Sequence, residues 1–150
     1  MDRLVEEERE GGEVMLIPNE SLFLKRTSQL FRNHKARAAR DHLRLGYTLE
    51  ELRTKARSAV LCPYCSTVLT TENLSADHAM PVARKTDCFT WTLLNTTFVC
   101  RKCNELKSAL THAEFSTLMT AVLAMPPQAQ QNVFSRLRAG AVRIYARGKR

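Results

Sequence analysis

The chain of 150 residues is long enough for one domain of ordinary size, and it has no apolar run of the length that a membrane span needs. Its formal net charge is +8. The first 13 residues hold six acidic and two basic side chains, so the rest of the chain is more basic than the total suggests. A strongly basic body indicates a polyanionic partner, most often nucleic acid, although a merely soluble basic protein has the same composition. The acidic start lacks the order of a signal peptide, so we expect an intracellular protein.

The N-terminal third is predicted to be a tail followed by helices. Residues 1–19 contain glycine and proline breakers and are expected to be an acidic disordered tail. Residues 20–57 are predicted to be a basic helical segment. Its first part is one long helix or two shorter ones with Gly46 as the C-cap, and a short helix follows. The stretch TLEE at 48–51 predicts the capping box of that short helix.

The rest of the chain changes from strands to helices. Residues 58–100 are rich in Val, Thr, Phe and Leu with turn residues between them, which favours short strands and loops. Helical patterns resume at about Arg101, and the stretch THAE at 111–114 predicts a second capping box. A last helix is predicted from Pro127 to about Arg138, ending at Gly140 ahead of a loose basic tail.

Four of the five cysteines form two CxxC pairs separated by 34 residues. Each CxxC turn can direct two thiolates at one ion, and two such turns complete a tetrahedral Zn²⁺ site with no open position. We therefore predict a structural zinc ion, with redox dithiols as the alternative. The predicted ligands are Cys62, Cys65, Cys100 and Cys103. The fifth cysteine, Cys88, is expected to be a free thiol.

Such a zinc ion would bring several polar residues together, and their order is informative. The stretch SADHAMP at 75–81 carries an adjacent Asp–His pair, LLN ends at residue 95, and CRKCNELK at 100–107 follows. With CPYC at 62–65, these motifs resemble those of the HNH endonucleases whose core is braced by four cysteines. The resemblance covers about residues 58–115 and implies an α+β protein. Its ββα-metal, treble-clef-like core would be flanked by N-terminal helices and by C-terminal helices with a basic tail over 116–150.

The resemblance also implies roles for individual residues. His78 would be the general base, Asn95 would orient the loop that holds His78, and Asp77 and Asn104 would bind one catalytic divalent ion, Mg²⁺ or Mn²⁺. Family members often have His at the last of these positions. The chemistry is reasonable, because a neutral imidazole can accept a proton from water and a hard divalent ion prefers carboxylate and amide oxygens. Adjacent residues of a regular strand face opposite sides, so Asp77 and His78 can serve one site only where the strand is twisted, bulged or ending.

Other positions are weaker candidates. The expected DNA contacts are Arg37, Arg40, Arg84 and Lys107, with solvated surface charges as the alternative. The turn RKTDC after the Asp–His motif lacks the glycines that are usual in the family. Trp91 is expected in the core, and the histidines at 34, 42 and 112 are expected at the surface or against the backbone.

Two functions follow. The first is an endonuclease that hydrolyses DNA phosphodiester bonds, nicking one strand or, for instance as a homodimer, cutting both. The alternative is a non-catalytic zinc module that binds nucleic acid. The set of Asp77, His78, Asn95 and Asn104 distinguishes them, because a binding module has no chemical need for it.

Overall fold

A computed structural model describes residues 19–82 and 91–147 of the protein, with side chains described through Gly140. Within this part of the chain there are five helices and one two-stranded antiparallel sheet, which makes the protein α+β as predicted. The elements are α1 Glu20–Arg40, α2 Leu49–Arg57, β1 Leu74–His78, β2 Thr96–Cys100, α3 Arg101–Lys107, α4 His112–Leu123 and α5 Pro127–Arg147. Among the described residues, no helix combines the length and the apolar character needed to cross a lipid bilayer.

Both predicted capping boxes are present. Thr48 and Glu51 exchange side-chain and backbone hydrogen bonds at the start of α2, and Thr111 and Glu114 do the same at the start of α4. Each box satisfies two backbone N–H groups that a helix start would otherwise leave without a partner. The second box fixes the start of α4, which lies across the predicted core boundary at residue 115.

Two predicted helix ends are wrong. The first helix ends at Arg40, because His42 takes a positive φ of 59° that turns the backbone out of the helix. Gly46 has another function: its N–H donates to Trp91 O at 2.7 Å, and an added Cβ would lie 3.0 Å from that oxygen. The last helix continues through Gly140 to Arg147, where a glycine costs only about 1 kcal/mol relative to alanine.

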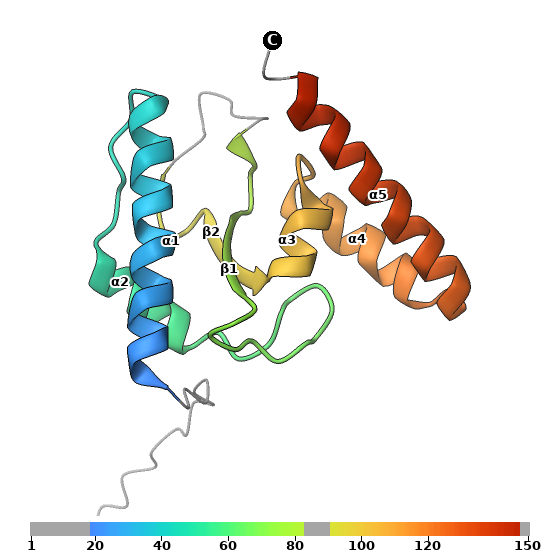
Figure 1. The fold of residues 1–150 in the computed structure, drawn as a ribbon, viewed down its shortest axis with the longest axis horizontal. Coiled ribbons are helices and arrows are strands. Elements are labelled where there is room, and N and C mark those ends of the chain that lie inside the picture. The colour runs from blue at the N-terminus through green and yellow to red at the C-terminus, as the bar shows by residue number, and fades with distance from the viewer. Residues whose placement is uncertain (1–18, 83–90, 148–150) are drawn as a thin grey trace, which may run out of the picture.

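The hairpin lies between helices on its two faces, with α1 on one side and α3 on the other (Figure 1). The two strands pair in register from Leu74 opposite Cys100 to His78 opposite Thr96. Because successive side chains of a strand alternate, Ser75 and Asp77 share one face, and Ala76 and His78 share the other. This alternation decides where the candidate site residues point.

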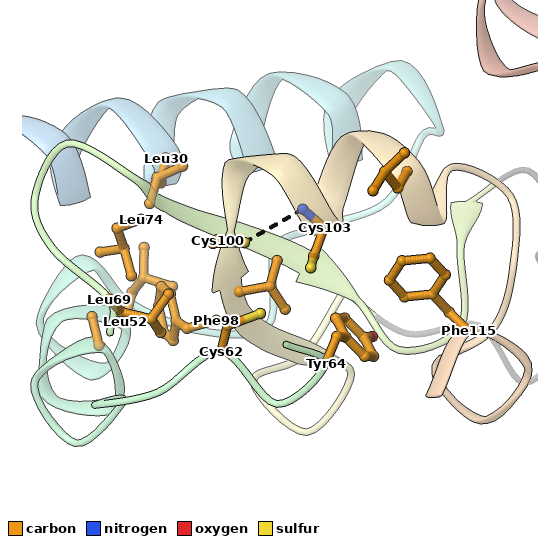
Figure 2. Close-up of a cluster of buried hydrophobic side chains, with 14 of the residues drawn as sticks. Leu30, Leu52, Cys62, Tyr64, Leu69, Leu74, Phe98, Cys100, Cys103 and Phe115 are labelled. Carbon is orange, nitrogen blue, oxygen red and sulfur yellow. Dashed lines mark hydrogen bonds between the residues drawn. The ribbon is translucent and has the colours of Figure 1, made fainter. Parts of the chain in front are cut away.

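The core surrounds the cysteines. Figure 2 shows apolar side chains from α1, α2, the hairpin and α4 around three of the four sulfurs. The labelled apolar side chains include Leu30, Leu52, Leu69, Leu74, Phe98 and Phe115, all exposed by 5% or less. Burying a Leu or Phe side chain contributes about 1.5–3 kcal/mol each, so this cluster dominates the apolar stabilisation. The predicted core position of Trp91 is also confirmed, at 2% exposure.

Candidate metal centre and adjoining polar residues

The two CxxC pairs come together as predicted. The sulfurs of Cys62, Cys65, Cys100 and Cys103 all lie within 4.8 Å of one another. The first pair sits in a tight turn, in which Cys62 N donates to Thr67 O at 2.8 Å and Ser66 takes a φ of 56°. The second pair joins β2 to α3. There Cys100 is the N-cap of the helix, and its sulfur accepts from the N–H of Cys103 (Figure 2).

The electrostatics of the four thiols suit a bound cation. A hydrogen bond from the Cys103 thiol lowers the pKa of Cys62, which favours a negative charge within the cluster. Burial raises the pKa of Cys100 to about 11, and the neighbouring negative charge adds to the rise. A soft divalent ion removes this conflict by neutralising the thiolates together. The donor set therefore fits Zn²⁺, and four sulfurs leave no coordination position for substrate.

Asp77 lies on the α3 side of the hairpin, where it forms an ion pair with Lys107. Lys107 Nζ is 2.8 Å from Asp77 Oδ2 and also donates to the carbonyl oxygen of His78 at 2.8 Å. Burial raises the pKa of Asp77, and the Lys107 ammonium opposes that rise. The Lys107 side chain is 0% exposed, so the DNA contact expected of this lysine is wrong for the structure described.

Asn104 faces the same side of β1 as Asp77. Its Nδ2 donates to Ser75 Oγ at 2.6 Å, and Ser75 is two residues before Asp77 on the same strand face. Asn104 also precedes Lys107 by one helical turn. Because the amide nitrogen is engaged by Ser75, the amide oxygen of Asn104 is the atom left to bind an ion. A carboxylate and an amide oxygen thus lie along one interface, between β1 and α3.

His78 points to the other side, toward α1. Its ring stacks on His34 with centroids 4.8 Å apart and planes 27° apart, and the edge-to-face contact with Trp91 spans 4.6 Å. His78 is 3% exposed, and burial lowers its pKa to about 3. The strand is regular through His78, so the adjacent predicted site residues diverge, and the structure does not bring their side chains into one cluster.

His34 is the functional candidate that sequence reasoning missed. It is 3% exposed, so the surface alternative is wrong, whereas its hydrogen bond to the Ala76 backbone agrees with the expected backbone contact. Burial lowers the pKa of His34 to about 4. Its burial follows the helical repeat of α1, in which the buried positions are Phe23, Thr27, Leu30, His34 and Ala38. These steps of three and four residues were a readable signal, because they place His34 on the core-facing stripe.

Two groups hold the chain directly after His78. The side chain of Asn95 accepts from Met80 N at 2.8 Å and donates to Met80 O at 3.3 Å, while Asn95 O accepts from Ala79 N at 2.9 Å. From α4, the backbone N–H of His112 donates to Ala79 O at 2.8 Å. Asn95 therefore holds the two residues that follow His78 through both its side chain and its backbone.

Two of the three arginines predicted to contact DNA lie among the described residues, and both are on α1. Arg37 is exposed on α1, one turn after His34, and its charge lowers the pKa of both His34 and His78 as a secondary cause after burial. Arg40 is exposed in the last turn of the same helix. Arg84 and Cys88 lie outside the described residues, as do residues 1–18 of the predicted tail, whereas Asn19 is the N-cap of α1.

The chain was also compared with known proteins. It matches no model of a known protein family, and no curated protein matches it. The assignment of function therefore depends on the residues and their geometry.

Proposed function

We propose that the protein is a metal-dependent endonuclease that hydrolyses DNA phosphodiester bonds, built on a ββα-metal core of β1, β2 and α3. The observation that carries the proposal is the order of elements around the hairpin. The four-cysteine cluster lies at the start of α3, and Asn104 of that helix faces the side of β1 that carries Asp77. Asn95 holds the residues after His78 by hydrogen bonds. The resemblance to HNH endonucleases implies roles in catalysis for the same residues.

The residues present fit a divalent ion of the hard type. Asp77 would supply a carboxylate oxygen and Asn104 its amide oxygen, donors that Mg²⁺ and Mn²⁺ prefer. Such an ion, when bound, polarises a phosphodiester and stabilises the leaving oxygen. The second oxygen of Asp77 is held by Lys107, which fixes the carboxylate in one orientation.

His78 would accept the proton of the attacking water. Burial keeps its imidazole neutral at neutral pH, which is the form that accepts a proton. A bound phosphodiester is an anion, and an opposite charge nearby raises the pKa of an imidazole toward the working pH. The role requires DNA binding to open a path to this ring, because His78 is 3% exposed.

Two observations favour the alternative, a non-catalytic zinc module that binds nucleic acid. The Asp77 carboxylate already has a cationic partner in Lys107, and the His78 ring is packed between two aromatic side chains. A purely structural role would explain both. The zinc cluster and the basic charge fit either function.

Cleavage of supercoiled plasmid DNA in Mg²⁺ or Mn²⁺ decides between the two. We expect the wild type to nick or linearise the plasmid and His78→Ala to lose at least about 10²-fold in rate, the lower range for general-base catalysis. His42→Asn is the matched control, since His42 is exposed and Asn tolerates its positive φ. Full activity of His78→Ala would refute the assigned base, and DNA binding without cleavage in either ion would establish the alternative.

A further inference from the structure

We propose that His34 of α1 is a positioning residue for His78, holding the imidazole ring in the plane and place from which it serves the reaction. The inference rests on the proposed function, and it extends the site beyond residues 58–115. It follows from the contacts between a helix outside that segment and the ring at the end of β1.

His34 is itself held on several sides. Its Nδ1 hydrogen-bonds the Tyr47 hydroxyl, and it hydrogen-bonds the backbone of Ala76 on the strand that carries His78. The rings of Tyr47 and Trp91 meet it edge-on, with centroids 6.3 Å and 5.9 Å away. A ring with these four contacts cannot rotate without breaking at least one of them, so His34 presents a fixed flat face.

That face sets the orientation of the His78 ring. The backbone of His78 is fixed by pairing with Thr96 and by the Lys107 ammonium on its carbonyl oxygen. What remains variable is the rotation of the side chain. His34 lies nearly parallel to the His78 ring, at 27°, and Trp91 lies nearly perpendicular to it, at 84°. The His34 and Trp91 ring planes are themselves 70° apart, so together they restrict the His78 ring to one orientation.

Simple core filling is the competing explanation, and two substitutions separate it from positioning. Leucine and phenylalanine at residue 34 are both apolar, and both lose the hydrogen bonds to Tyr47 and Ala76. Only phenylalanine keeps a flat ring for His78 to stack on. A core-filling role predicts similar behaviour of H34F and H34L, whereas positioning predicts that H34L alone releases the His78 ring.

The first readout is independent of activity. The ring C–H resonances of His78 in an ¹H–¹³C NMR spectrum, identified by their loss in His78→Ala, report the neighbouring aromatic rings. Because H34L also removes the ring current of His34 itself, the deciding signals are the nuclear Overhauser effects between these ring protons and the Trp91 ring, which lies 4.6 Å away in the wild type. We expect these effects to be kept in H34F and lost in H34L. Equal effects to Trp91 in the two variants would overturn the proposal. Should H34L fail to fold, H34M takes its place, because the unbranched methionine adapts to irregular space.

The second readout is the cleavage rate. A displacement of a reacting group by about 1 Å can cost ~10²-fold in rate, so we expect kcat to fall about 10²-fold in H34L with KM within a few-fold of wild type. H34F should lie at least about 10-fold above H34L. Equal kcat values for the two variants would overturn the proposal. If the wild type cleaves no DNA, the proposed nuclease function fails, and the nuclear Overhauser effects to Trp91 still decide whether His34 positions His78.

Discussion

The ion pair between Asp77 and Lys107 gives a stability prediction whose size follows from burial. Lys107→Met removes the ammonium and keeps an unbranched side chain of similar length in a site with 0% exposure. The change leaves the Asp77 carboxylate, 11% exposed, without its cation and the carbonyl oxygen of His78 without its donor. Removing one partner of a buried pair costs about 3–5 kcal/mol, so the free energy of unfolding should fall by that amount. For a chain of this size the melting temperature should fall by roughly 6–20 °C.

The sign of the pH dependence tests the cause. Burial already raises the pKa of Asp77, and loss of Lys107 removes the charge that opposes the rise. The folded variant then binds a proton that the unfolded chain has released, so its stability falls as pH increases from the unfolded pKa to the raised one. The deficit of Lys107→Met relative to wild type should therefore be smaller at pH 5 than at pH 8. Urea unfolding at both pH values, with Zn²⁺ present throughout, measures the difference.

A double-mutant cycle completes this test. Asp77→Asn combined with Lys107→Met leaves two neutral side chains, so the double variant should be more stable than Lys107→Met alone. Lys102→Met is the control, because Lys102 is exposed on the same helix and its contact with the Phe134 ring is worth at most about 1 kcal/mol. A loss below about 1 kcal/mol in Lys107→Met, with no coupling to Asp77, would refute the buried ion pair.

Three further predictions concern the metal, pH and DNA. Cys103→Ser should abolish tight binding of zinc and destabilise the fold, whereas Cys88→Ser should retain about one zinc per chain by elemental analysis, a stoichiometry typical of a four-cysteine site. Zinc retained by Cys103→Ser would contradict the four-sulfur site. Because burial depresses the pKa of His34 from 6.5 to about 4, the unfolded chain binds its proton first and stability is lost as pH falls through that window. Between these pH values the free energy of unfolding should fall by roughly 3 kcal/mol less in H34F than in the wild type, as measured by urea unfolding. Identical dependence of the unfolding free energy on pH in the two proteins would exclude a buried neutral His34. Arg37→Ala should weaken DNA binding and reduce the slope of log K against log salt by about 0.9, and an unchanged slope would mean that Arg37 meets no phosphate.

The sequence predicted best those features whose chemistry is local. The capping boxes need only residues three positions apart, and the cysteine cluster needs only two tight turns whose sulfurs meet. The two predictions of helix ends at Gly46 and Gly140 were wrong for a local reason too. A glycine permits a helix to end but does not make it end. His42 could take the left-handed conformation without being glycine, and Gly140 could stay helical.

The features that sequence reasoning missed depend on packing between distant segments. Lysine is usually a surface residue, and Lys107 is buried because α3 lies against the face of β1 that carries Asp77. His34 precedes His78 by more than forty residues, and only the docking of α1 on the hairpin brings the two rings together. Neither partner could be read from spacing, although the buried stripe of α1 already marked His34 as inward-facing.

The adjacency of Asp77 and His78 is what joins the two halves of the protein. Strand alternation sends one side chain to α3, which the cysteine cluster braces, and the other to α1. A nuclease reaction would need both sides at once, and β1 ends at His78. The proposal therefore requires the scissile phosphate to lie at this strand end, next to the Ala79–Met80 backbone that Asn95 clamps, where it can meet an ion from one face and an imidazole from the other. A loss of rate in H34L that H34F does not share would then show that α1 is part of the site itself and not only a basic arm beside it.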